Sequence, residues 1–263
     1  WDMNRSITEC YSVALPADRQ GEVFHRYILG VYDLYERLTT AFPQILFESC
    51  ASGGGRFDPG MLYYAPQGWI SDDTDAAERV RIQYGTSMCY PISSMGSHVS
   101  VVPNHQLNRI TSLHTRANVA YFGTFGYELD LNKLTDEEIA EVKAQIIFMK
   151  EYRELIQFGN FYRLKSPFDG NETVWMTVSE DKRKALVFWY RERNVVNAEF
   201  TRVRLQGLDP DLIYKNEYNG TENYGDELMN LGLLTTDVTA GEPTNEDLPC
   251  TDYESRIYVL TAE

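Results

Sequence analysis

Carboxylate-bearing segments follow three predicted strands: residues 1–5 (WDMNR), residues 48–58 (ESCASGGGRFD) and residues 71–75 (SDDTD). In βα barrels, the residues after the strands gather at one rim, and that rim holds the active site. Asp2 and Asp72 come from different strands and are therefore expected to face each other across one pocket. Two carboxyl groups that flank a glycosidic bond can divide the work, since one attacks the anomeric carbon while the other protonates the leaving oxygen.

The spacing of such a pair determines the stereochemistry. A separation of about 5–5.5 Å leaves no room for water and means retention of configuration. The acid member must stay protonated near neutral pH, which burial and a neighbouring carboxylate such as Asp73 or Asp75 promote. The simpler interpretation of an acidic residue after a strand is a helix cap, and we expect Asp75 or Thr74 to cap the helix that follows.

The run of small residues 52–55 (SGGG) allows close approach of the backbone to a ligand. A phosphate loop would need the GxxxxGK[ST] pattern, and no lysine follows the run. Cys50 beside it has the chemistry of a nucleophile, but nothing marks a matching histidine for a Cys–His protease. We interpret Cys50 as a small residue that lines a pocket.

A metal site is not expected, because the histidines show neither HExxH nor CxxC-type spacing. We interpret His25 as a helix-surface residue and His98, at a strand end, mainly as a packing residue that could also contact a ligand. Trp69 and the pair 63–64 are suited to stacking on sugar faces, although aromatic residues at such positions are more often part of a core.

The sequence changes its pattern of expected elements near residue 165, which predicts two domains. Up to residue 165, expected strands over 45–47, 68–70, 93–101 and 124–129 alternate with helices over 22–41, 75–84, 107–121 and a last helix capped by Thr135 with Glu138. This alternation favours βα units and a parallel sheet. From 166 to 263, expected strands over 173–178, 185–190, 201–205, 211–216 and 257–261 are separated by turns, which is typical of a small antiparallel β-sandwich.

The first domain, residues 1–165, supplies about half of a (β/α)8 barrel, which needs eight strands and about 250 residues. An open half-barrel would expose an unpaired strand edge and an uncovered core. Trp1 also stands inside what we interpret as a buried motif. We therefore expect the missing half of the barrel to lie upstream in a longer polypeptide, and the 263 residues to be inactive and poorly folded by themselves.

Composition restricts the class of partner. The chain is 43% hydrophobic and 24% charged, as in a folded globular protein, and its formal net charge is −15. A negative charge of this size repels the phosphate backbone of nucleic acid, but it does not oppose the binding of a neutral sugar. No stretch approaches the roughly 18–20 apolar residues of a membrane span. Four separated cysteines favour thiols in a reducing compartment, so we expect a cytoplasmic location.

These segments, in this order, resemble family 36 α-galactosidases of the bacterial long-chain type. The resemblance rests on residues 1–4, 48–60, 69–75, 96–100 and 115–116, which extend over most of the first 130 residues. It implies that Asp2 is the nucleophile and that Asp72 is the acid/base, with Asp73 as the second choice. The substrate-binding residues that we carry over or expect beside them are Trp1, Asn4, Cys50, Ala51, Ser52 and Gly53.

The resemblance also implies an activity: retaining hydrolysis of terminal α-1,6-linked galactose, as in melibiose and raffinose, without a cofactor and in a homo-oligomer, a tetramer by family resemblance. One departure is the stretch Cys-Ala-Ser-Gly at residues 50–53, where Cys-Ser-Gly-Gly is more usual. Two other interpretations stay open. One is a raffinose-synthase-like transglycosylase, which would use the same two carboxylates. The other is a non-catalytic carbohydrate-binding fragment, against which the presence of both Asp2 and Asp72 argues.

Overall fold

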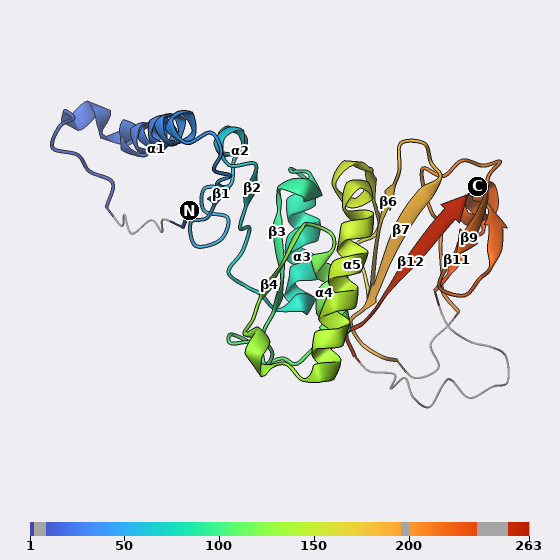
Figure 1. The fold of residues 1–263 in the computed structure, drawn as a ribbon. Helices are drawn as coiled ribbons and strands as arrows, with labels where there is room; N and C mark the ends of the chain where they lie inside the picture. The colour runs from blue at the N-terminus through green and yellow to red at the C-terminus, as the bar shows by residue number, and fades with distance from the viewer. Residues whose placement is uncertain (3–8, 196–199, 236–251, 263) are drawn as a thin grey trace. The chain divides into compact units, whose positions relative to one another are not determined.

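The computed structural model describes residues 1–2, 9–195, 200–235 and 252–262. The chain divides into two compact units, residues 1–72 with 94–96 and residues 73–93 with 97–263. Figure 1 shows the path of the chain and the labels used below.

The first unit combines helices with short parallel strands. Its elements are η1 (Ala17–Glu22), α1 (Val23–Ala41), β1 (Glu48–Ser49), α2 (Pro59–Tyr64) and β2 (Gln67–Gly68). Strands β1 and β2 pair in parallel. Isolated parallel bridges join Asp2 to Cys50 and Gly68 to Met95. The predicted parallel βα pattern is therefore present, although its paired segments are shorter than expected.

An aromatic cluster forms the core of this unit. Tyr35 of α1 is buried, stacks on Trp1 at 4.9 Å between ring centroids, and meets Phe47 edge-on. Helix α2 packs its buried Met61 against this cluster. The start of α2 follows from local chemistry, because Pro59 fits the first turn and the Asp58 side chain accepts a hydrogen bond from the Met61 N–H.

The predicted buried strand over 45–47 is wrong. The paired residues are Glu48 and Ser49, while Ile45 and Leu46 are 50% and 75% exposed in this chain. The position of the strand is set by backbone pairing on both of its sides: the Cys50 N–H donates to the Trp1 carbonyl and the Trp69 N–H donates to the Ser49 carbonyl. The apolar run itself does not select the strand.

The second unit begins with α/β elements: α3 (Ala76–Ser87), β3 (Gly96–Ser100), α4 (Leu113–Ala120), β4 (Thr124–Glu128) and α5 (Asp136–Phe158), with short turns η2 (Ile92–Ser94) and η3 (Leu131–Lys133). The end residues Ser94 of η2 and Gly96 of β3 belong to the first unit. Strands β3 and β4 pair in a two-stranded sheet. The capping box predicted for α5 is confirmed, because Thr135 and Glu138 each bond the backbone N–H of the other. Helix α4 begins six residues later than predicted. Ser112 caps it, and residues 104–109 form a hydrogen-bonded loop instead.

The C-terminal part is an antiparallel sheet domain. Six strands lie in the order β10-β9-β12-β7-β6-β5, and β11 with β8 forms a second, two-stranded sheet. The bounds are β5 (Asn160–Lys165), β6 (Glu172–Val178), β7 (Lys184–Arg191), β8 (Arg202–Val203), β9 (Ile213–Asn216), β10 (Glu222–Tyr224), α6 (Gly225–Asn230), β11 (Leu233–Leu234) and β12 (Glu254–Ala262). All five expected strands are present, and β5, β10, β11 and α6 are additional. The boundary at residue 165 stays a prediction.

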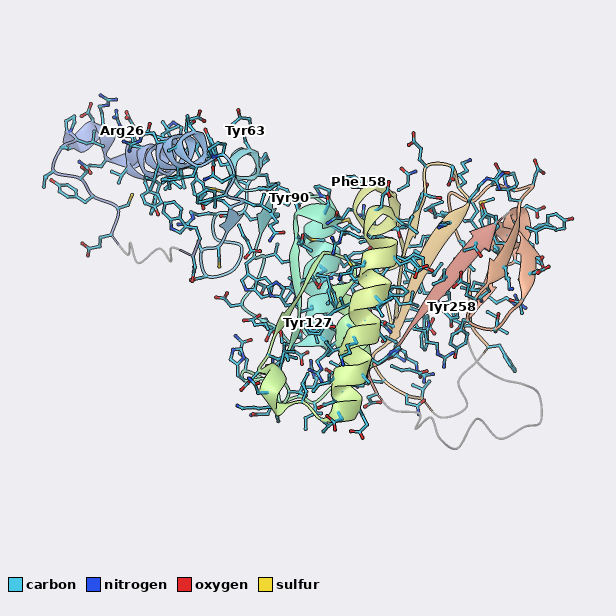
Figure 2. The ribbon with its side chains drawn as sticks, viewed as in Figure 1. Arg26, Tyr63, Tyr90, Tyr127, Phe158 and Tyr258 are labelled. Atoms are coloured by element: carbon cyan, nitrogen blue, oxygen red, sulfur yellow. The ribbon has the colours of Figure 1, made fainter. Side chains whose placement is uncertain are left out.

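Each face of the large sheet is covered within this unit. On one face, Trp189 and Tyr258, of which Figure 2 labels Tyr258, join a buried cluster with Val203 of β8 and Leu233 of β11. On the other face, Trp175 and Phe188 pack around the ring of Phe122, which follows α4. Helix α5 lies beside β6 and β7 in Figure 1 and contacts both strands. The helices of this unit and its sheet therefore share one core.

Candidate active site

Asp2 lies at the end of the first parallel segment, next to the loop that follows β1. A parallel bridge pairs Asp2 with Cys50, and the Cys50 N–H donates to the Trp1 carbonyl at 2.9 Å. The thiol of Cys50 shares a hydrogen bond with the Asp2 carboxylate. The pairing of two neighbouring strand ends thus sets the Asp2 side chain beside the Cys50 side chain.

The glycine run brings the same loop against the segment that carries Asp72. Ser52 and Gly53 both adopt left-handed backbone conformations, with φ values of 48° and 70°. A Cβ atom on Gly53 would lie 2.6 Å from the Ser71 Cα and 3.0 Å from the Asp72 backbone nitrogen. Only a residue without a side chain fits this approach. The small residues therefore serve close contact between two backbone segments of the site.

The pKa of the Cys50 thiol is affected by the carboxylates of both Asp2 and Asp72. Burial is the largest cause that raises the pKa of the Cys50 thiol; the hydrogen bond to Asp2 and the negative charges of Asp2 and Asp72 raise it further, against a lowering contribution from the backbone of Gly53. The bridge between Asp2 and Cys50 and the close approach of Gly53 to the Asp72 backbone place both carboxylate-bearing segments beside this loop. Asp2 and Asp72 are both exposed to solvent in this chain, so a substrate can reach them.

Arg56 supports the loop from within, a role that the sequence analysis did not assign. Its side chain is buried, and its Nη2 donates to the Cys50 carbonyl at 2.5 Å. The signal available in the sequence is an arginine directly after a glycine run, where a cation can hold the carbonyl groups of the loop.

The other predicted substrate-binding residues differ in their surroundings. Ala51 is buried, Ser52 is exposed and Gly53 is buried. Trp1 is half-buried against Tyr35 and lines a cavity of about 330 Å³ with Tyr27, Val31 and Arg26, the last labelled in Figure 2. Neither Asp2, Cys50 nor Asp72 lines this cavity. Asn4 lies outside the described residues.

The acidic residues after Asp72 serve the next helix. Asp75 is buried and its carboxylate accepts hydrogen bonds from the Ala77 and Glu78 N–H groups at 3.0 and 3.1 Å, which confirms the predicted cap. The Asp73 carboxylate accepts a hydrogen bond from the Asp75 N–H at 3.0 Å. Asp75 also pairs with Arg109, so its charge is balanced.

Two of the histidines lie in different surroundings. His25 is exposed on α1, as predicted, and His98 of β3 lies 3.6 Å from the Glu128 carboxylate while Gly126 packs against its ring. Within the described ranges, no group of three or more His, Cys, Asp or Glu residues is arranged to hold a metal ion. In the same ranges, none of the helices has the length and apolar character needed to span a membrane.

Comparison with known proteins identifies the class. Residues 1–159 match the Melibiase family, and residues 172–260 match the glycosyl hydrolase family 36 C-terminal domain. The α/β portion followed by an antiparallel sheet domain is thus that of a glycoside hydrolase, consistent with a partial (β/α)8 barrel and a C-terminal β domain. The chain belongs to glycoside hydrolase family 36.

Individual relatives agree with this assignment. The chain is 57% identical over 233 residues to alpha-galactosidase AgaA of Geobacillus stearothermophilus and 53% identical to alpha-galactosidase 1 of Pediococcus pentosaceus, in each case over 89% of this chain and 32% of the relative. The crystal structure of AgaA superposes with a TM-score of 0.91 at 52% identity, over all of this chain and 35% of that one. The chain therefore spans about a third of the length of these relatives.

Proposed function

We propose that this chain contributes the two catalytic carboxylates of a retaining α-galactosidase, with Asp2 as the nucleophile and Asp72 as the acid/base. The observation that carries the proposal is that one loop contacts both carboxylate-bearing segments, within a chain of family 36: Cys50 bridges to Asp2, and Gly53 lies against the backbone nitrogen of Asp72. A nucleophile and an acid must reach one anomeric centre together, and two carboxylates on segments that contact the same loop are suited to that requirement.

The reaction is a double displacement. An Asp2 oxygen attacks C1 of the galactose ring and forms a glycosyl ester, while the Asp72 carboxylic acid gives its proton to the departing glycosidic oxygen. The Asp72 carboxylate then takes a proton from water, the water oxygen attacks C1, and the ester bond to Asp2 breaks. Two inversions at C1 give net retention, and Asp72 ends protonated, ready for the next cycle.

Asp72 is preferred to Asp73 as the acid/base on structural grounds. The Asp73 carboxylate accepts a hydrogen bond at the start of α3, whereas Asp72 is exposed and its charge reaches Cys50. A group that exchanges a proton with substrate needs access to it.

The solved relatives supply independent support for the pair. Variants of AgaA were crystallised with raffinose and with stachyose, and each variant has one aspartate replaced. Those two aspartates are 70 positions apart, the same separation as Asp2 and Asp72. We infer that the substrates are raffinose-type oligosaccharides with a terminal α-1,6-linked galactose.

Galactose binding is assigned to the loop beside the carboxylates. The residues proposed are Cys50, Ala51, Ser52 and Gly53, with Trp1 and Asn4 from the first segment. The loop carries polar backbone groups in a shape that Arg56 and the glycine contact fix. The Trp1 ring also stacks on Tyr35, so it has a packing role in this chain as well.

The complete enzyme requires more than this chain. Since the chain spans about a third of its relatives, we propose that the remaining barrel strands come from the N-terminal part of the same polypeptide. Homo-oligomer formation and a cytoplasmic location stay predictions. A transglycosylase would use the same carboxylates and is distinguished by its products in the presence of excess acceptor sugar.

Rescue by azide assigns the two roles separately. The test uses a full-length family 36 polypeptide that carries these residues, with Asp72→Gly and Asp2→Gly as variants and Asp73→Gly as the control. An acid/base variant passes its glycosyl intermediate to azide and should give α-galactosyl azide, whereas a variant without the nucleophile admits azide directly and should give β-galactosyl azide. The opposite anomers, or rescue in Asp73→Gly alone, would overturn the assignment.

A further inference from the structure

Arg109 connects three segments of the second unit. Its guanidinium pairs with the Asp75 carboxylate, lies 3.5 Å from the Glu78 carboxylate, and stands over the Tyr253 ring at 5.0 Å from its centroid. Asp75 and Glu78 belong to the first turn of α3, while Tyr253 directly precedes β12 of the C-terminal sheet. One side chain thus joins the start of a barrel helix to the C-terminal domain.

The Asp75 end of this connection is buried. The Asp75 side chain is only 2% exposed, and it accepts hydrogen bonds from two N–H groups of α3. A buried carboxylate without a cation is strongly destabilised. The position of the α3 start therefore depends on the position of the Arg109 guanidinium.

The Tyr253 end is held by its backbone. The Tyr253 N–H donates to the Glu192 carbonyl at 2.9 Å, and its carbonyl accepts a hydrogen bond from the Thr115 hydroxyl of α4 at 2.9 Å. Close by, the Ser255 hydroxyl accepts from the Asn118 amide of the same helix at 3.0 Å. The backbone that carries the ring under Arg109 is consequently bonded both to α4 and to the residue that follows β7.

The loop that carries Arg109 is ordered by Asn104. The buried Asn104 side chain accepts hydrogen bonds from the Gln106 and Leu107 N–H groups and donates to the Thr74 hydroxyl at 3.2 Å. The Asn104 N–H donates to the Arg109 carbonyl at 2.9 Å. Two neighbouring residues before α3 are therefore held from the same loop: Thr74 by a hydrogen bond from Asn104, and Asp75 by its ion pair with Arg109.

We propose that Arg109 is a positioning residue through which the C-terminal β domain fixes the segment that follows Asp72 in the chain, and so the direction in which Asp72 presents its proton. This proposal rests on the proposed acid/base role of Asp72. It gives the C-terminal domain a part in catalysis, because the Tyr253 ring and the Asp75 carboxylate share one guanidinium. A planar, stacked and paired guanidinium is not replaceable by an ammonium group.

Leaving-group dependence separates positioning of the acid from general stability. Cleavage of a 2,4-dinitrophenyl α-galactoside needs no protonation of the leaving group, whereas cleavage of raffinose does. In the full-length polypeptide, we expect Arg109→Gln to lower kcat/KM for raffinose by about tenfold or more while kcat/KM for the dinitrophenyl substrate falls less than about threefold. Arg109→Lys should recover only part of the loss.

Arg81→Gln is the matched control. Arg81 also extends from α3 to the C-terminal domain, where it pairs with Glu192 at 2.5 Å, and within α3 it lies 3.9 Å from the Glu78 carboxylate instead of pairing with the Asp75 cap. It should lower the melting temperature without changing the ratio of the two kcat/KM values. If Arg109→Gln does not fold, Tyr253→Asn replaces it, since Tyr253 has a φ of 61° that asparagine tolerates.

Asp72→Ala tests the acid/base role of Asp72 separately from the positioning role of Arg109. Strong leaving-group dependence in Asp72→Ala together with Arg109→Gln or Tyr253→Asn supports the proposal. The dependence in Asp72→Ala alone, with parallel losses on both substrates in the Arg109 and Tyr253 variants, would overturn the positioning role only. Its absence from Asp72→Ala would overturn the acid/base role and this proposal with it.

Discussion

At the scale of residues, the candidate site is built around Cys50 and Gly53. Cys50 contacts one carboxylate by a hydrogen bond and senses the charge of the other, while Gly53 lets the loop reach the backbone at residues 71 and 72. The first is a chemical relation and the second a steric one. Each is open to a test that does not measure turnover alone.

Alkylation of Cys50 tests the electrostatics of the site. A raised pKa leaves less thiolate at any given pH, so the rate of iodoacetamide labelling of Cys50 should rise only above the pH range of an ordinary thiol. Asp2→Asn removes a negative charge and should move the labelling profile to lower pH. Peptide mass spectrometry of the full-length polypeptide, with exposed Cys89 as the internal comparison, gives both rates. Labelling of Cys50 at an unusually low pH would contradict the arrangement.

Substitution of Gly53 tests the steric relation. In Gly53→Ala, the new Cβ would lie 2.6 Å from the Ser71 Cα, and the residue would have to keep a φ of 70°. We therefore expect the free energy of unfolding to fall by about 1–3 kcal/mol and the activity to be reduced. Gly85→Ala in α3 is the control, since nothing lies within 4 Å of its added Cβ, and it should be neutral or stabilising by roughly 0.5–1 kcal/mol. Equal melting temperatures for the two variants would show that the loop does not approach residues 71–72 as described.

At the scale of elements, local chemistry fixes helix starts more firmly than strand positions. Thr135 begins α5, Asp75 begins α3 and Asp58 begins α2, each through a side-chain hydrogen bond to the first turn. Such caps act within four residues, and the sequence analysis predicted two of these three starts. Strands are selected by partners far along the chain, which explains the error at 45–47 and the omission of β10 and β11.

The cap of α5 gives a quantitative test at this scale. Thr135→Ala removes the hydroxyl that accepts a hydrogen bond from the Glu138 N–H at 3.2 Å. We expect the free energy of unfolding to fall by about 1 kcal/mol. Hydrogen exchange at the amides of residues 136–139 measures the opening of that turn directly. Lys143→Ala, in the exposed middle of the helix, should leave exchange at these amides unchanged; equal effects of both variants would argue against the capping box.

The candidate site itself was only partly predictable. The motifs around Asp2 and Asp72 indicated two carboxylates at one rim, and the helix-cap role of Asp75 followed from its position. Two contacts join residues that are 18 or more positions apart: Gly53 with Ser71, and Arg109 with Tyr253. A third buries the charged side chain of Arg56 against the Cys50 carbonyl. No periodicity in the sequence encodes which loop meets which, so these contacts required coordinates.

At the scale of the whole molecule, the length of the chain limits what it can do by itself. It spans about a third of its relatives, and α1 exposes Phe24 and Leu29 at 40% and 51%. We expect the isolated chain to show no α-galactosidase activity and its first unit to be digested by trypsin before the second, whose sheet is covered on both faces. Turnover of an aryl α-galactoside by the isolated chain would contradict this expectation.

Covalent trapping tests the central claim most directly. A full-length polypeptide carrying these residues is treated with an activated fluorinated galactoside that forms, but barely hydrolyses, the glycosyl ester, and the labelled peptide is sequenced by mass spectrometry. We expect one galactosyl label, on Asp2, and a loss of at least about 10³-fold in kcat for Asp2→Asn. A label on any other residue, or near-normal turnover in Asp2→Asn, would contradict it.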